Sequence, residues 1–201
     1  MDKIDSLDKI NALVSDIRSL RKGYLTNFFL DRKKHSLWIE KGELFYVSFP
    51  DCYFLLHLTN SVNNLFFITT TSQQLAENLK AFLPIFAEQM VVDIVGDAKI
   101  VDLKDVFVEQ GFSVYEQLYR MNRIGTLEFK EIDTPNVCFA EDVDAQVVLD
   151  MLHSYFDPLS EQLPSYEEIL YFISQKSVLV YKEAGLSLIH ISEPTRLLSI
   201  S

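Results

Sequence analysis

The first hydrophobic positions of the chain recur with helical spacing. Charged residues separate the apolar positions that fall near a 3.6-residue period, which are Ile4, Leu7, Leu13, Ile17 and Leu20. This pattern predicts an amphipathic helix over residues 4–20. Gly23 follows Arg21 and Lys22 and is expected to end this helix, because glycine adopts left-handed backbone angles and basic side chains suit a helix C-terminus.

Short apolar runs come next and are typical of β-strands. The predicted strands are Ser36–Ile39, Leu44–Phe49, Tyr53–Leu58 and Leu65–Thr70. Lys41-Gly42 lies between the first two runs and predicts a hairpin turn. Pro50-Asp51 separates the second run from the third.

The segment after Thr70 predicts alternating helices and strands. Thr71 and Ser72 are candidate N-caps, and Pro84 is expected to kink or end the helix that they open. The elements expected in this segment are a helix over Gln73–Phe86, a buried strand over Met90–Val95, a helix over Lys99–Gln110 closed by Gly111, and a strand over Ser113–Met121.

After Arg123 the pattern of elements restarts. Ser165 and Glu168 have the spacing of a capping box, and Lys182–Gly185 reads as the start of a hairpin turn. The elements expected here are a strand over Val137–Phe139, a helix over Ala145–Phe156, a helix after Ser165 and a strand over Ser177–Tyr181.

The last sixteen positions, 186–201, read LSLIHISEPTRLLSIS. Leu186–Arg196 matches the translation of a transposase-end adapter used in sequencing-library preparation, and the remaining positions fit the barcode and the fixed segment that follow it. We therefore expect residues 186–201 to be a non-native tail that does not pack as an element of the fold. The natural protein is then expected to run on past Gly185.

Composition limits the function classes. The chain has 201 residues, 18 basic against 29 acidic, and a net charge of −11, which disfavours nucleic-acid binding because phosphate contacts require clustered Lys and Arg. No apolar run approaches the roughly 20 residues that span a bilayer, and the N-terminus has no signal core. A cytoplasmic protein is expected, in which Cys52 and Cys138 are two buried thiols.

The order of elements resembles the GNAT superfamily of N-acetyltransferases, present twice in tandem. The residues that carry this resemblance are the buried strand Val91–Val95, the helix Lys99–Gln110, the pair Gly111-Phe112 and the strand Ser113–Met121. The resemblance implies an α/β (α+β) fold with a mixed, mostly antiparallel sheet flanked by helices, followed by an incomplete second copy. The expected parts are a first copy over 1–123, a linker over 124–133, the start of a second copy over 134–185, and the tail over 186–201.

The resemblance also implies where acetyl-CoA would bind. Family members hold its pyrophosphate in a glycine-containing loop between a central strand and the next helix. Here that loop falls at Ile68–Leu75, which reads ITTTSQQL and has no glycine. The hydroxyls of Thr70–Ser72 are more simply interpreted as helix caps. The family's acid, a tyrosine four residues before the Gly-Phe pair, is replaced here by Phe107.

Other candidate residues have simpler structural interpretations. Tyr115 and Tyr119 are expected to pack, Glu40 and Glu43 to be solvated turn charges, and His57 to be a half-buried, satisfied histidine. His35 is placed in a solvated loop and His153 in a partly packed helix position. The carboxylates Asp157, Glu161, Glu167 and Glu168 either attract a basic substrate or stabilise helix N-termini. No residue is therefore assigned to catalysis, to cofactor binding or to a metal.

Three interpretations remain open at this point. The first is the N-terminal part of an acetyl-CoA-dependent N-acetyltransferase, with the cofactor held by the intact protein and this part itself inactive. The alternative is a non-catalytic GNAT-like module for ligand binding or dimerisation. A third possibility is an α/β domain that is unrelated to this superfamily. The expected partners are a small-molecule or amine acceptor of unknown identity, or a second copy in a homodimer, with no nucleic acid and no membrane.

Overall fold

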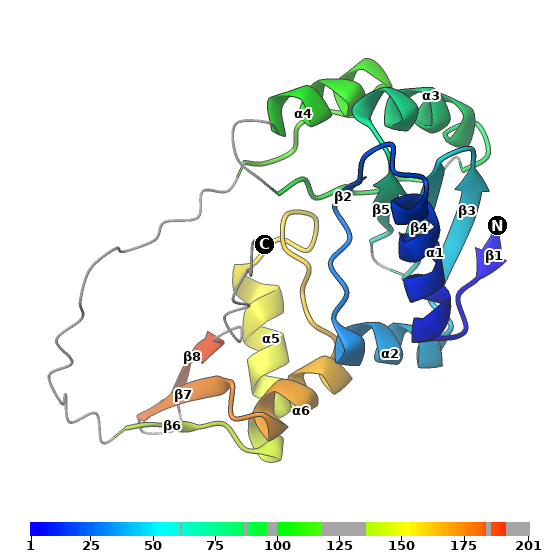
Figure 1. Cartoon of the computed structure of the whole chain (residues 1–201). Coiled ribbons are helices and arrows are strands. Elements are labelled where there is room, and N and C mark those ends of the chain that lie inside the picture. The colour runs from blue at the N-terminus through cyan, green and yellow to red at the C-terminus, as the bar shows by residue number, and fades with distance from the viewer. Residues whose placement is uncertain (61, 87, 96–99, 118–135, 184–185, 192–201) are drawn as a thin grey trace, which may run out of the picture. The chain divides into compact units, whose positions relative to one another are not determined.

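The computed structural model describes residues 1–60, 62–86, 88–95, 100–117, 136–183 and 186–191 (Figure 1). The chain divides into two compact units, Met1–Glu116 and Gln117–Ser201, which we call unit 1 and unit 2. The described elements are mixed α+β with antiparallel sheets. The expected fold class is confirmed at this level.

The sheet of unit 1 is built around three apolar strands. Its order in the described residues is β1 (Asp2–Lys3), β3 (Leu44–Phe49), β4 (Cys52–His57), β5 (Asn64–Thr69) and β2 (Leu25–Thr26), with every neighbouring pair antiparallel. The strands predicted from the second, third and fourth apolar runs are confirmed as β3, β4 and β5. The two short edge strands have no signal in the hydrophobic pattern.

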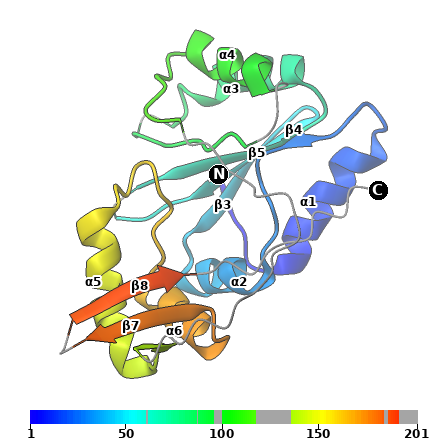
Figure 2. The ribbon, with the colours of Figure 1, turned by 90° about the vertical axis from the view of Figure 1, so that its left-hand side faces the viewer.

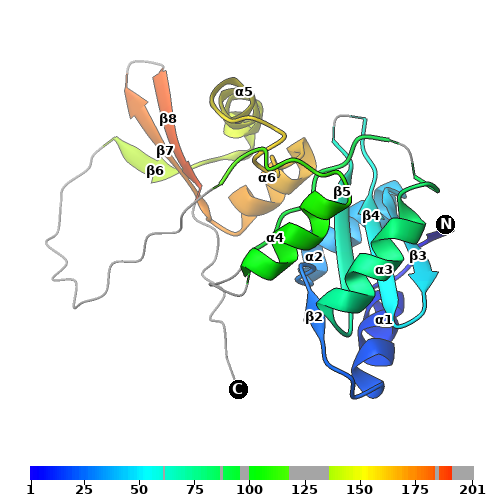
Figure 3. The same ribbon diagram turned by 90° about the horizontal axis from the view of Figure 1, so that it is seen from above.

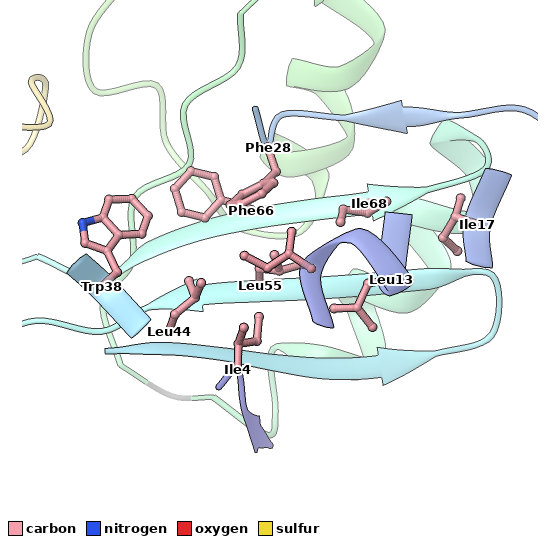
Figure 4. Packing of buried hydrophobic residues seen from close by; sticks show 10 residues of the cluster. Ile4, Leu13, Ile17, Phe28, Trp38, Leu44, Leu55, Phe66 and Ile68 are labelled. Carbon is pink, nitrogen blue, oxygen red and sulfur yellow. The ribbon is translucent and has the colours of Figure 1, made fainter. Parts of the chain in front are cut away.

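One face of this sheet is covered by α1 (Leu7–Ser19) and α2 (Arg32–Lys41) (Figure 2). Figure 4 shows how side chains from both helices meet those of the strands, with Trp38 at one end of the layer and Ile17 at the other. The buried residues of this first core are Ile4, Ile10, Leu13, Ile17, Phe28, Trp38, Leu44, Leu55, Phe66 and Ile68. The N-terminal helix is thus confirmed, but it begins at Leu7 after the N-cap Ser6, and Ile4 lies before it.

The opposite face is covered by α3 (Ser72–Phe82) and α4 (Ile100–Glu109), which lie along the sheet in Figure 3. The buried residues of this second core are Cys52, Phe54, Leu56, Leu65, Phe67, Leu75, Leu79, Phe82 and Phe107. Successive side chains of β4 and β5 therefore alternate between two cores. This explains why both strands read as nearly continuous apolar runs.

The predicted hairpin around Lys41-Gly42 is wrong, because the first of its two strands, Ser36–Ile39, lies in the helix α2. The Asp31 carboxylate accepts hydrogen bonds from Lys33 N at 2.9 Å and Lys34 N at 3.0 Å, which caps the helix start. Gly42 ends the helix with φ of 74°. These two terminal signals outweigh the apolar character of Leu37–Ile39.

Two further predicted strands differ from the structure. The segment Met90–Val95 is extended but pairs only at Val91, in a parallel bridge to Asn64. Residues 113–117 form no strand, and the rest of the predicted strand Ser113–Met121 lies outside the described residues. The preceding helices are confirmed, with α3 ending at Phe82, before Pro84.

Unit 2 places two helices on a small antiparallel sheet. Its described elements are β6 (Val137–Phe139), the short 3₁₀ turn η1 (Asp142–Asp144), α5 (Ala145–Tyr155), α6 (Tyr166–Ser174), β7 (Val178–Glu183) and β8 (Leu186–Ile191), with strand order β6-β7-β8. The capping box is confirmed: Ser165 N donates to Glu168 Oε2 at 2.8 Å, and Glu168 N donates to Ser165 Oγ at 3.4 Å. The buried core residues are Ala140, Ala145, Val148, Ile169, Ile173, Val178 and Val180.

The expectation that the tail forms no element of the fold is wrong for Leu186–Ile191, which pairs with β7 as the strand β8. The physical reason is that the edge of β7 offers unpaired backbone groups, and an apolar segment close behind it in the sequence satisfies them without side-chain selection. Residues 192–201 lie outside the described residues.

The backbone at Gly23 approaches the sheet so closely that a side chain cannot be accommodated. Gly23 has φ of 119°, and a Cβ atom there would lie 2.5 Å from the Thr70 carbonyl oxygen. Gly111 also has positive φ, 94°, but a Cβ atom there would meet nothing within 4 Å. A residue with a side chain would therefore be strained at both positions, and at Gly23 it would also meet a backbone atom.

We expect Gly23→Ala to destabilise unit 1 by about 3 kcal/mol or more, because strain and a backbone clash add, whereas Gly111→Ala costs about 1–2 kcal/mol from strain alone. Urea unfolding followed by the fluorescence of Trp38, the single tryptophan, measures both. Equal losses in the two variants would contradict the close approach at Thr70.

Candidate functional site

The position where the resemblance places the cofactor loop is the junction between β5 and α3. The strand ends at Thr69 and the helix begins at Ser72. After α3 the chain returns parallel to β5, since Val91 N donates to Asn63 O and Leu65 N donates to Val91 O, both at 2.8 Å. A strand, a helix and a parallel return place a helix N-terminus at the carboxyl end of a strand, where open sheets bind ligands.

The N-terminus of α3 is capped by a side chain of the protein itself. Thr71 Oγ1 accepts a hydrogen bond from Gln74 N at 3.2 Å, which confirms the capping interpretation for this hydroxyl. The side-chain amides of Gln73 and Gln74 donate hydrogen bonds to the two carboxylate oxygens of Glu77, at 3.0 and 3.1 Å. A carboxylate in the second turn of the helix opposes the binding of a phosphate there.

The segment after α1 covers the same junction. Gly23 lies against the Thr70 carbonyl, and Lys22 Nζ is paired with Asp51 Oδ2 at 2.7 Å. Asp51 sits in the β3–β4 turn with φ of 54°, and its carbonyl accepts a hydrogen bond from Thr69 Oγ1 at 3.1 Å. The ammonium of Lys22 therefore already has an anionic partner at this junction.

The backbone edge of β5 is also occupied. Asn27 Oδ1 accepts from Phe67 N at 2.7 Å, and Asn27 Nδ2 donates to Leu65 O at 3.2 Å and to Asp93 O at 3.0 Å. Thr26 Oγ1 donates to Phe67 O. Between Leu65 and Phe67, each backbone group on this edge is bonded to Thr26, Asn27 or Val91, so an extended ligand has no backbone partner there.

The residues at this junction do not fit acetyl-CoA. The backbone cradle that glycines provide is missing, the first helical turn is capped internally, and the strand edge is filled by Thr26 and Asn27. The remaining acid candidates do not compensate: Phe107 is buried without a titratable group and Tyr115 is 62% exposed on an irregular segment. Tyr119 lies outside the described residues.

A different group of side chains meets at the other end of the sheet, below α2. His57 Nε2 lies 3.2 Å from Glu43 Oε2, and the His57 ring stacks on Trp38 with centroids 3.7 Å apart and planes inclined by 8°. The interpretation of His57 as a satisfied histidine is confirmed, and Glu43 is its partner. The interpretation of His35 as a loop residue is wrong, because it is only 3% exposed and lies in α2.

Sequence reasoning missed this group because it placed Ser36–Ile39 in a strand. The signal that could have revealed it is the spacing of His35 and Trp38, which on a helix brings both rings to one face. Their rings meet edge to face with centroids 4.8 Å apart.

The remaining candidates are surface or capping groups. Glu40 and His153 are exposed, while Glu168 is buried as the capping partner of Ser165. Asp157 Oδ1 accepts from Leu159 N at 2.9 Å in the turn after α5. Within the described residues, no group of three or more His, Cys, Asp or Glu side chains could hold a metal ion.

Comparison with known proteins gives no relative: no family model, no curated protein and no solved structure matches the chain. None of the described helices combines the length and apolar character needed to cross a membrane.

We expect Asn27→Ala to lower the free energy of unfolding of unit 1 by about 2–4 kcal/mol, since it leaves the buried Phe67 N–H without an acceptor and removes two further hydrogen bonds. Asn63→Ala is the matched control, because its amide donates only at an exposed position, to Glu88 Oε2 and Gln89 O. The control substitution should lower the free energy of unfolding by less than about 1 kcal/mol. Urea titration followed by Trp38 fluorescence measures both, and a small loss in Asn27→Ala would contradict a closed edge.

The two cysteines should differ in reactivity. Burial raises the pKa of the Cys52 thiol to about 12 despite a hydrogen bond to Thr69 that lowers it, so no thiolate forms there at neutral pH. Cys138 is exposed, which corrects the expectation that both thiols are buried. A thiol reagent at pH 8 should therefore label one cysteine in the native chain and two in urea. Cys138→Ser should abolish native labelling, and native labelling of Cys52 would contradict its burial.

Proposed function

We propose that this chain belongs to an acetyl-CoA-dependent N-acetyltransferase in which unit 1 does not hold the cofactor. The observation that carries the proposal is the parallel return of Val91 beside β5 after α3, within an otherwise antiparallel sheet. It is followed by the helix α4, which ends at Glu109 shortly before Gly111-Phe112. This is the part of the GNAT-like order of elements that positions a cofactor loop. Thr71, Gly23 and Asn27 close the β5–α3 junction, which favours a non-catalytic role for unit 1.

On this proposal, the chemistry belongs to the second GNAT-like copy. Unit 2 has the strand, the two helices and the next strand with which that copy opens. The strand, the glycine-containing loop and the helix that would hold acetyl-CoA and the amine acceptor are then encoded past Gly185. Unit 1 then takes no part in the chemistry.

A non-catalytic module is the second candidate, and one observation favours it. Strand β6 is at an edge of the described sheet of unit 2, and its side chains Val137 and Phe139 are 38% and 51% exposed. An exposed apolar edge strand is a surface on which strands of two chains pair. This candidate predicts a homodimer formed through β6.

We expect calorimetric titration of the chain with acetyl-CoA to give a dissociation constant weaker than about 1 mM, because the β5–α3 junction has no glycine cradle and the edge of β5 between Leu65 and Phe67 is occupied by Thr26, Asn27 and Val91. The titration uses Cys138→Ser, so that the exposed thiol does not react with the thioester. A micromolar constant would overturn the closure of the β5–α3 junction.

The two candidates are separated by reading the source gene past Gly185 and assaying its full product. A glycine-containing loop after Arg or Gln, and thiol release from acetyl-CoA with a panel of amines, are the results expected of the enzyme. A glycine-free loop, no thiol release and a dimer that Val137→Lys dissociates would support the module instead.

A further inference from the structure

Two buried histidines flank the single tryptophan of the chain. His35 is 3% exposed and His57 is 8% exposed. Their ring centroids lie 4.8 and 3.7 Å from that of Trp38. We call His35, Trp38, Glu43 and His57 the histidine–tryptophan cluster. It joins α2 to the sheet, since His35 and Trp38 come from the helix, and His57 from β4.

The hydrogen bonding fixes the protonation of His35. Asp31 N donates a hydrogen bond to His35 Nδ1 at 2.9 Å. A backbone N–H is always a donor, so Nδ1 must present a lone pair, and the ring is neutral with its proton on Nε2. Asp31 is also the N-cap of α2, so this bond ties the start of the helix to the cluster.

His57 differs from His35 in the group that its ring nitrogen contacts. The partner of His57 Nε2 is the Glu43 carboxylate, at 3.2 Å, and a carboxylate accepts from a neutral or a charged imidazole alike. The face of Trp38 also attracts a cation. Protonation of His57 therefore adds an ion pair with Glu43 and preserves its contacts with Glu43 and Trp38.

The charged groups around the cluster come from three elements. Asp31 is the N-cap of α2 and Lys34 lies in its first turn, Glu43 directly precedes β3, and His57 is the last residue of β4. Lys34 Nζ lies 4.9 Å from the centroid of the indole ring, and the positive end of the helix dipole is at the same end of α2. The Phe28 ring also packs against His35, with centroids 4.6 Å apart and planes inclined by 39°, and His35 is buried from solvent.

Protonation of His35 therefore opposes the packing of α2 on the sheet. A proton taken from solvent forms an N–H bond at Nδ1 and breaks the hydrogen bond from Asp31 N, leaving two N–H groups that face each other. The Asp31 carboxylate attracts the new charge, but Lys34 and the helix dipole repel it. Protonation therefore destabilises the docked helix, because the acceptor for Asp31 N is lost regardless of the charges nearby.

We propose that α2 is a proton-sensitive latch of unit 1, docked on the sheet while His35 is neutral and released in mild acid when His35 takes up a proton. The unfolded chain binds this proton near pH 6.5, and the docked helix excludes it. The stabilisation is therefore fully present above that pH and is lost as the pH falls. Below about pH 6.5 the unfolding constant of unit 1 should rise by up to tenfold for each pH unit.

The experiment follows Trp38 fluorescence in urea titrations of the full chain from pH 7.5 to 5.5, above the range in which exposed carboxylates titrate. The wild type should lose stability over this range, with a red shift of the emission as α2 leaves the sheet. His35→Gln retains a side-chain acceptor without a titrating ring and should remove the pH dependence. His57→Gln and His153→Gln should retain it, because neither change alters the bond to Asp31.

An unchanged pH dependence in His35→Gln would overturn the proposal. Should that variant fail to fold, the ring nitrogen resonances of wild-type His35 provide a second test. They should report a neutral ring with an unprotonated Nδ1 for as long as the Trp38 emission is native. A charged His35 ring in a chain whose Trp38 emission is unchanged would also overturn the latch.

Discussion

The structure of unit 1 depends on a sheet that is apolar on both faces. Phe54 and Leu56 point to one core and Leu55 to the other, and β5 alternates in the same way. A sheet of this kind cannot leave either face in water, so it requires the layer of α1 and α2 and the layer of α3 and α4 together. The loss of either layer exposes a face that buries large side chains.

The same constraint explains the closure of the β5–α3 junction. The segments that cover the faces of β5 also cover its edge between Leu65 and Phe67, so the backbone N–H and carbonyl groups there require partners within the protein. Asn27 supplies two such bonds to β5 from one side chain, to Phe67 N and Leu65 O, and Thr26 supplies a third, to Phe67 O. Side chains that satisfy the strand edge internally remove the groups that a ligand would use, so stability and cofactor binding compete for the same atoms.

Sequence reasoning succeeded where one local signal was sufficient. The capping box of Ser165 and Glu168 and the apolar runs of β3 and β5 each define an element without reference to the rest of the chain. It failed at α2, where the caps Asp31 and Gly42 outweighed an apolar run, and at β8, where an available edge decided the pairing. The bonds of Asn27 to Leu65, Phe67 and Asp93 depend on a tertiary arrangement that no local pattern encodes. The caps of α2, by contrast, are visible in the sequence.

Both edges of the unit 1 sheet are made by the first 26 residues, since Asp2–Lys3 pairs with β3 and Leu25–Thr26 pairs with β5. Each edge strand is made before the strand with which it pairs, since β3 ends at Phe49 and β5 ends at Thr69. An edge strand therefore has no partner when it is made and can pair only once a later part of the chain has been added. During this interval a nascent chain has unpaired strands, and the length of the interval is set by the time needed to translate the residues between the two partners.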